Sequence, residues 1–361
     1  MTHIPGAVWL KRKLFGNPPL VDPLRLIPFD LPENRGPVQA VDPEQLLNNY
    51  KESTVSNEPN RFVLYRIIGN DLFPRHRIGQ SQDNLRFILQ NEPNLEDCEK
   101  RFVVNRIVNR KEEKKILKML NEAGVTYIHI PFLIEEFLQI GWDIKDIPPE
   151  YAPFSIGFSL LGEKRQERVL MRAYRYKNNY VMNNNGARNM ALREGRDIAK
   201  WVLPWDGNCF LNENSWNEIT EALKAHPEIP YYLVPMARII DNKNLLDKNF
   251  RPDAGEEPQI IFRRDASLEF NTEFFYGRRP KVELFWRLGV PGKWNSWKIE
   301  PWDLPCPEYS NQAGYFGFAG WVARLFSGDI NLERGVTSLI DRGDARNKAI
   351  RTFLDALEDE E

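Results

Sequence analysis

Hydrophobic runs alternate with amphipathic stretches between residues 61 and 130. Residues 62–68 form a compact run of β-branched, aromatic and aliphatic side chains, which predicts a buried strand. Apolar positions at strand or helical spacing then predict a helix over 81–90, a strand over 101–108, a helix over 112–123 and a strand over 125–130. Strands and helices that alternate at this spacing predict a parallel sheet with helices packed on its faces.

The pattern continues less regularly towards the C-terminus. It predicts helices over 162–176, 186–194 and 214–225, strands over 199–205, 231–236 and 258–262, and a helical piece over 317–357. The first sixty residues lack lasting periodicity, apart from a short helix near 43–51. The sequence therefore predicts an extended N-terminal arm over 1–60, one α/β catalytic unit over 61–300 and a helical C-terminal appendage over 301–361.

Composition narrows the classes of function. Lysine plus arginine number 49 against 51 for aspartate plus glutamate, so no overall basic field favours nucleic acid as a partner. Cys98, Cys209 and Cys306 lie far apart, which disfavours a disulfide scaffold or zinc site and favours a reducing compartment. Neither a membrane-spanning apolar run nor a signal peptide is evident. We expect a cytoplasmic protein, with residues 9–15 as a candidate for peripheral membrane contact.

Short polar residues stand at the ends of the expected strands. Ligands of open α/β sheets bind beyond the carboxyl ends of the strands. Residues 69–71 follow the first strand, Asn105 lies near the end of the second, and Asp206-Gly207-Asn208 follow the fourth. Such residues suit nucleotide hydroxyls and a hard metal ion, with Asp206 and Asn208 as oxygen ligands of Mg²⁺ or Mn²⁺. On local sequence alone, a simple Asx-turn is the more ordinary explanation of Asp-Gly-Asn.

The surroundings of this last cluster carry a family resemblance. Gly186-Ala187-Arg188-Asn189, followed by the apolar strand that ends in Asp206-Gly207-Asn208, resembles glycosyltransferase family 2. In that family a Gly, a small residue and Arg-Asn open a helix, and the next strand ends in an Asp-x-Asp metal motif. The resemblance covers about residues 61–290, where residues 103–109 and 285–289 occupy the places of two further family elements.

The resemblance implies a GT-A fold, a Rossmann-like and mostly parallel sheet with helices on both faces. It further implies a nucleotide-sugar donor, expected to be UDP-linked, a glycan or glycolipid acceptor, and Mn²⁺ or Mg²⁺ as cofactor. The implied donor-binding residues are Arg66, Asn70, Asp71, Asn105, Arg188, Trp205 and Asp206. Flat indole faces suit sugar rings, so Trp294, Trp297 and Trp302 are the candidates for the acceptor side.

Several positions depart from the family pattern. The metal motif ends in Asn208 instead of Asp, and Asn105 replaces the nucleoside-reading Asp. Pro280 and Lys281 occupy the place where inverting members have a Glu-Asp pair that contains the general base. The remaining candidates for the base are Glu283, Glu273 and Asp265. A retaining mechanism without such a base stays open.

Two other classes of function compete with this interpretation. A nucleotidyltransferase would share the α/β layout but would normally carry a glycine-rich phosphate loop, which residues 69–71 do not supply. A carbohydrate-binding or scaffold protein on a decayed transferase fold would explain the altered residues at 208, 280 and 281. The sequence leaves both alternatives open.

Overall fold

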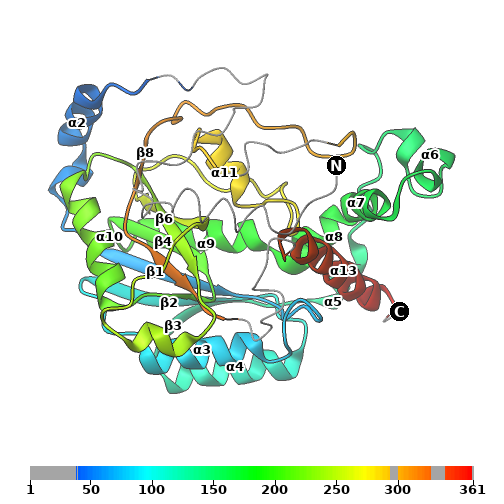
Figure 1. Cartoon of the computed structure of the whole chain (residues 1–361), viewed down its shortest axis with the longest axis horizontal. Helices are drawn as coiled ribbons and strands as arrows, with labels where there is room; N and C mark the ends of the chain where they lie inside the picture. The colour runs from blue at the N-terminus through cyan, green and yellow to red at the C-terminus, as the bar shows by residue number, and fades with distance from the viewer. Residues whose placement is uncertain (1–37, 39, 293–299, 327–337, 360–361) are drawn as a thin grey trace, which may run out of the picture.

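A nine-stranded mixed sheet forms the centre of the molecule (Figure 1). The computed structural model describes residues 38, 40–292, 300–326 and 338–359. The strand order is β3-β2-β1-β4-β7-β6-β9-β5, and β8 pairs with β6. The strands are β1 (Phe62–Ile68), β2 (Cys98–Asn105), β3 (Thr126–Ile130), β4 (Trp201–Asp206), β5 (Cys209–Phe210), β6 (Tyr231–Arg238), β7 (Glu256–Arg263), β8 (Phe316–Phe318) and β9 (Val322–Arg324).

Four neighbouring strands form one parallel part of this sheet, and β8 and β9 also pair parallel to β6. β3, β2, β1 and β4 all run in the same direction, and β7 continues the sheet antiparallel to β4 and β6. In the β1–β4 pair, Phe62 lies opposite Trp201 and Ile67 lies opposite Asp206. The carboxyl ends of β1 and β4 are therefore level, so the loops that follow them leave the sheet side by side. The expected mostly parallel α/β sheet is confirmed.

Helices cover both faces of the sheet, as expected. α3 (Gln80–Asn91), α4 (Arg110–Glu122) and α10 (Glu213–Ala225) pack on one face, and α9 (Asn184–Arg196) and α11 (Val282–Arg287) on the other (Figure 1). α9 lies especially close to the sheet, because a Cβ on Gly195 would stand 2.5 Å from Val202 and 3.1 Å from Val63. A side chain at position 195 would therefore push α9 away from β1 and β4.

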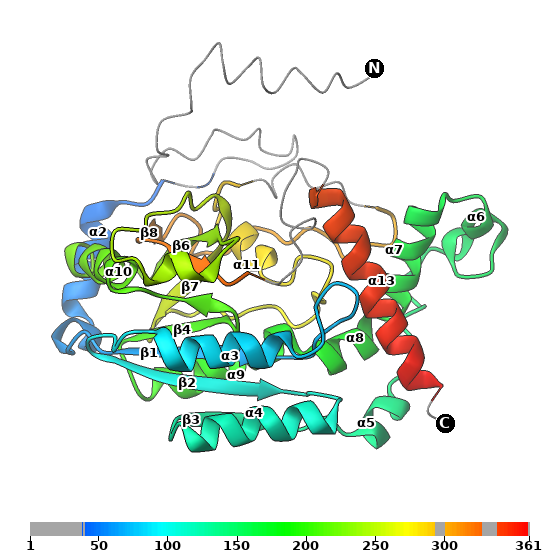
Figure 2. The ribbon, with the colours of Figure 1, turned by 60° about the horizontal axis from the view of Figure 1, so that its bottom comes forward.

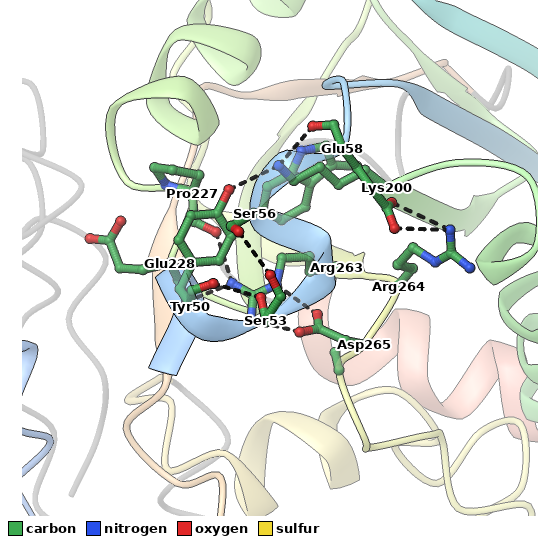
Figure 3. Close-up of polar contacts among 12 residues, drawn as sticks. Tyr50, Ser53, Ser56, Glu58, Lys200, Pro227, Glu228, Arg263, Arg264 and Asp265 are labelled. Carbon is green, nitrogen blue, oxygen red and sulfur yellow. Dashed lines mark hydrogen bonds and ion pairs between the residues drawn. The ribbon is translucent and has the colours of Figure 1, made fainter. Parts of the chain in front are cut away.

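The short helix near residue 43 anchors the end of the N-terminal segment. α2 (Pro43–Glu52) is capped by Asp42 and is followed by the 3₁₀ turn η1 (Thr54–Asn57). The Lys200 ammonium, just before β4, donates to the Tyr50 hydroxyl at 2.9 Å and to the Glu58 carbonyl at 3.3 Å (Figure 3). α2 is thus fixed at the amino end of β4, opposite to the end where Asp206 lies. The rest of the arm, including residues 9–15, falls outside the described residues.

The remaining helices gather beside the carboxyl ends of the parallel strands (Figure 2). They are α5 (Ile134–Gln139), η2 (Pro149–Tyr151), α6 (Ile156–Ser159), α7 (Glu163–Ala173), α8 (Arg175–Met182) and α13 (Ser338–Glu358). The 3₁₀ turn η3 (Asn242–Leu246) follows β6 and packs through Leu245 into the core beneath α3 and α4. The helix expected over 162–176 is thus two helices, α7 and α8. Ion pairs from Lys164 to Asp344 and from Lys177 to Glu358 hold α13 against them. In the described part of the chain, no helix has the length and apolarity needed to cross a membrane.

The C-terminal appendage differs from the expectation. Residues 316–318 and 322–324 are strands of the main sheet, so the prediction of a helical segment from 317 onwards is wrong there. Val322 and Ala323 are fully buried beside β6. Strands of three residues are too short to show alternation in the sequence. Tertiary pairing with β6 therefore determines their structure, and the sheet does not end at residue 300.

Candidate functional site

A cavity of about 1160 Å³ opens at the carboxyl ends of the parallel strands. Its lining includes residues that the sequence marks separately in four distant stretches: Asn70, Asp71, Asn105, Arg188, Asp206 and Asn208. The level ends of β1 and β4 explain why the loops after both strands meet here. The structure thus brings six of the expected site residues together in the lining of one cavity. This cavity lies in the place where open α/β sheets bind ligands.

Asn70 joins the loop after β1 to the loop after β2. Its Nδ2 donates to the Arg106 carbonyl at 2.8 Å, and its Oδ1 accepts from the Val108 backbone N–H at 2.8 Å. Arg106 has a φ of 44° and stacks its guanidinium 3.8 Å from the centre of the Tyr180 ring. One amide therefore fixes the relative position of two loops at the mouth of the cavity.

Asp71 and Asn105 are held by partners within the protein. Asp71 Oδ1 accepts from the Ser81 hydroxyl at 2.7 Å and from its backbone N–H at 3.1 Å, which ties the loop to α3. Burial raises the Asp71 pKa, and the bonds from Ser81 oppose that rise. Asn105 donates to the Met182 carbonyl at 2.7 Å and accepts from Asn183 at 2.9 Å. Both residues shape the cavity wall and hold the neighbouring helices in place.

Asp206 is the most strongly paired acid of the cavity. Its Oδ1 lies 2.7 Å from Arg188 Nη2, and its Oδ2 lies 2.9 Å from Gln259 Nε2 and 3.5 Å from Lys281 Nζ. Burial raises the pKa of this carboxyl, but the charges of Lys281 and Arg188 outweigh burial and hold the pKa well below its usual range. Asp206 is therefore a fixed anion at the end of β4.

The expected divalent metal does not fit this donor set. Mg²⁺ is bound through the lone pairs of one or two carboxylates together with substrate phosphates and waters. Here both oxygens of Asp206 accept from N–H donors, two of which belong to the cations Arg188 and Lys281. Among the described residues, no group of three or more His, Cys, Asp and Glu is placed to hold a metal ion. We derive no step through Mn²⁺ or Mg²⁺.

Basic residues slightly outnumber acidic ones in the cavity lining, although the whole chain has a formal net charge of −2. Ten of its lining residues are arginine or lysine and eight are aspartate or glutamate. Burial, with the charges of Arg75, Arg324 and Arg346, lowers the pKa of His76 to about 3. Burial and the neighbouring Arg278 lower the pKa of Arg279 to about 9. Like charges act on both groups, so the cavity suits an anionic ligand.

Two predicted donor-binding residues lie in the core instead. Arg66 is fully buried, forms an ion pair with Glu92 and donates to the Cys209 carbonyl at 2.8 Å. Trp205 is fully buried and donates through Nε1 to the Ile260 carbonyl at 2.8 Å. Neither lines the cavity, so the predictions that they contact the donor are wrong. Both side chains point to the face of the sheet that α3 and α10 cover.

The three candidates for the general base lie outside the cavity lining. Glu283 is fully buried, forms an ion pair with Arg287 and accepts from the Asn271 N–H at 3.2 Å. Glu273 forms an ion pair with Arg175. Asp265 takes both donors of the Arg263 fork at 2.6 and 3.0 Å (Figure 3). The geometry does not support any of them as a base for a ligand in this cavity.

Of the expected acceptor tryptophans, Trp302 is the one that the described residues include, and it gives no surface. Trp302 is fully buried and packs edge-on against the Tyr151 ring, with centroids 5.4 Å apart, so the prediction that it flanks an acceptor is wrong. Trp294 and Trp297 fall outside the described residues. The neighbouring Asp303 does line the cavity, where it forms an ion pair with Arg278.

Sequence reasoning missed the partners that surround Asp206. Glu257 and Gln259 were not expected near it, and Lys281 was expected only in the place of the family's Glu-Asp pair, not as a partner of Asp206. Arg278-Arg279-Pro280-Lys281 places three cations within four residues, and this run was a signal in the sequence. Gln259 and Glu257 gave no such signal, because only the antiparallel pairing of β7 with β4 brings them to Asp206.

A scan of the chain against protein-family models and a search of curated proteins found no match. The site therefore has to be interpreted from its own geometry.

Proposed function

We propose that this chain is a glycosyltransferase of the GT-A fold that binds a nucleoside diphosphate sugar, UDP-linked, in the cavity at the strand ends. One observation carries the proposal: the polar ends of β1, β2 and β4 converge on a single cavity, in whose lining basic residues outnumber acidic ones by ten to eight. The strand order β3-β2-β1-β4 followed by an antiparallel β7 is compatible with that fold.

Two sides of the cavity suit different parts of the proposed donor. The loop at 69–71 and Asn105 form the side for the nucleoside. Arg188 and Lys281 form the cationic side, where a diphosphate fits by charge. The sugar would be transferred to a hydroxyl of a glycan or glycolipid acceptor.

The proton of that hydroxyl needs an acceptor near the reacting atoms. The acids in the cavity lining are Asp71, Asp206, Glu218, Asp253, Glu256, Glu257, Asp303 and Asp344. Glu257 has a half-exposed carboxylate beside Lys281, so it is the first of them to test. A base from this set replaces the three candidates that lie outside the cavity.

Thermal unfolding with a panel of nucleotide sugars tests the proposal. A ligand that binds only the native state raises the midpoint, so UDP-sugars should raise it more than UMP or the free sugars do. Release of UDP from the ligand that binds, in the presence of glycan or glycolipid acceptors, would then measure transfer. If no nucleotide sugar raises the midpoint, the proposed donor site is wrong.

Two results would favour the alternatives. A midpoint raised by glycans but not by nucleotides would point to a carbohydrate-binding or scaffold protein. Consumption of a nucleoside triphosphate with release of pyrophosphate would point to a nucleotidyltransferase instead.

A further inference from the structure

Lys281 is a nearly buried cation on the cavity wall. Its residue is 3% exposed, and its Nζ lies 3.5 Å from Asp206 Oδ2 and 3.3 Å from Glu257 Oε1. An ammonium has three N–H donors, and these two carboxylates account for two of them among the described residues. The carboxylates thus hold the ammonium in place at the surface of the cavity, and one donor remains for a ligand.

Arg188 fixes the other side of the same carboxylate. Its Nη2 donates to Asp206 Oδ1, and its Nη1 donates to Asn185 Oδ1 at 2.9 Å. The residue is 5% exposed. Gln259 completes the set through Asp206 Oδ2. Asp206 therefore works as an internal anchor for two cations, in the place where a metal-dependent site would keep its lone pairs open.

The turn that carries Lys281 adds further positive charge. Arg279 lines the cavity two residues earlier and has a φ of 60°. A left-handed conformation is strained for a residue with a side chain and occurs most often at functional sites. The turn thus presents two cations, Arg279 and Lys281, to the same space.

We infer that Lys281 and Arg279 bind the diphosphate of the ligand directly, without a divalent metal ion, and that Asp206 and Arg188 position Lys281 for this contact. That the ligand carries a nucleoside rests on the proposed function. Binding of the diphosphate does not depend on it. Hydrogen bonds from charged donors to phosphate oxygens are short and strong, and protein cations supply the positive charge that a metal supplies in other transferases.

Binding of inorganic pyrophosphate and of UDP, each measured by calorimetry in EDTA and again with Mn²⁺, tests the inference. We expect both ligands to bind in EDTA and Mn²⁺ to add less than about threefold to either affinity. Lys281→Met should weaken both ligands at least about tenfold, because a charge-assisted bond is lost. Arg279→Gly should weaken pyrophosphate in the same way, and glycine adopts the left-handed backbone without strain.

Lys200→Met is the matched control. Lys200 is also 3% exposed, but it lies at the opposite end of β4 and bonds to Tyr50 and Glu58 (Figure 3). This variant should bind both ligands as the unchanged protein does. Circular dichroism establishes that each variant is folded, and the EDTA titration of the unchanged protein needs no variant at all.

Each outcome separates the two proposals. Binding of UDP and pyrophosphate only with Mn²⁺ would overturn the metal-free site and leave the proposed function standing. Pyrophosphate that binds in EDTA while UDP binds no tighter would uphold the cation site and contradict a nucleotide-sugar donor. Absence of binding in both conditions would overturn both proposals.

Discussion

Asn70 Nδ2 lies 2.8 Å from the carbonyl oxygen of Arg106, and this single contact joins the loops that follow two neighbouring parallel strands. The same amide accepts from Val108 N–H at 2.8 Å, so both of its ends are used between the loops. The positions of the two loops are therefore coupled through one side chain that lines the cavity. A ligand that spans both loops would meet a preformed wall.

Replacing Asn70 by Ala tests whether this contact supports the stability of the protein and the binding of a ligand. We expect about 1–3 kcal/mol of lost stability, because the Arg106 carbonyl and Val108 N–H lose a half-buried partner. Affinity for the nucleotide ligand should fall as well, since the loops are no longer held together. Urea unfolding and UDP titration measure the two effects. Asn121→Ala, which removes an exposed side-chain bond to Tyr127, is the control and should change neither.

Gly207 tests the close approach of the loop after β4 to β1. A Cβ at this position would stand 2.5 Å from the Ile67 carbonyl oxygen, and backbone cannot give way as a side-chain tip can. We expect Gly207→Ala to displace Asp206 and to weaken UDP binding by about tenfold or more. Gly141→Ala is the matched control, because no atom lies within 4 Å of its Cβ and the residue does not line the cavity. Equal binding by both variants would contradict a role for this packing.

The buried ion pair of Arg66 and Glu92 lies on the face of the sheet that α3 and α10 cover. It should contribute strongly to the stability of the protein. Both side chains are 0% exposed, and Glu92 also accepts from the Leu211 N–H at 2.9 Å. Glu92→Leu leaves a buried guanidinium without its counter-charge, so we expect a loss of about 3–5 kcal/mol in urea unfolding. Asp83→Ala breaks the exposed pair with Arg77 and should cost less than about 1 kcal/mol. A similar cost for both variants would refute the distinction.

His76 should make the protein sensitive to mild acid. Its pKa is lowered to about 3 in the folded state, first by burial and then by Arg75, Arg324 and Arg346, whereas the unfolded value is about 6.5. Between these values the unfolded state binds the extra proton. Stability is therefore full above about pH 6.5 and falls below it, by at most about 1.4 kcal/mol per pH unit.

A single substitution isolates this contribution. The His76 Nδ1 accepts from the Leu72 N–H at 3.2 Å, and an asparagine oxygen is able to replace that acceptor. The stability of His76→Asn should therefore change less between pH 7 and 5 than that of the unchanged protein. His226→Asn, at an exposed position, should leave the pH profile as it is. Parallel profiles for all three proteins would show that His76 is not responsible.

Local pattern was sufficient for most of the fold. The expected strand at 62–68 matches β1, and the helix expected over 214–225 matches α10 within one residue. Both have strong periodicity and clear ends. β8 and β9 could not be predicted, because three residues show no period and their structure depends on pairing with β6.

The site divides in the same way. The polar strand ends were predictable, because the carboxyl ends of parallel strands meet at one edge whatever the helices between them. The direction in which each side chain points was not predictable. Arg66 and Trp205 each lie near the right strand end but point to the opposite face, and Lys281 reaches Asp206 only through tertiary packing. Spacing along the chain does not contain that information for residues so far apart.

β8 and β9 join the main sheet far along the chain from β6, and this affects when the sheet is completed during synthesis. About 80 residues separate β6 from β9, so at roughly 5–20 residues per second the edge of β6 waits roughly 4–16 s during synthesis for its partner. An unpaired strand edge is a template for other chains during that interval. Phe318, Trp321 and Arg324 belong to this late segment and also line the cavity. The cavity lining is therefore completed only after this segment has been made, and conditions that slow the ribosome prolong the time in which the nascent sheet is open to aggregation.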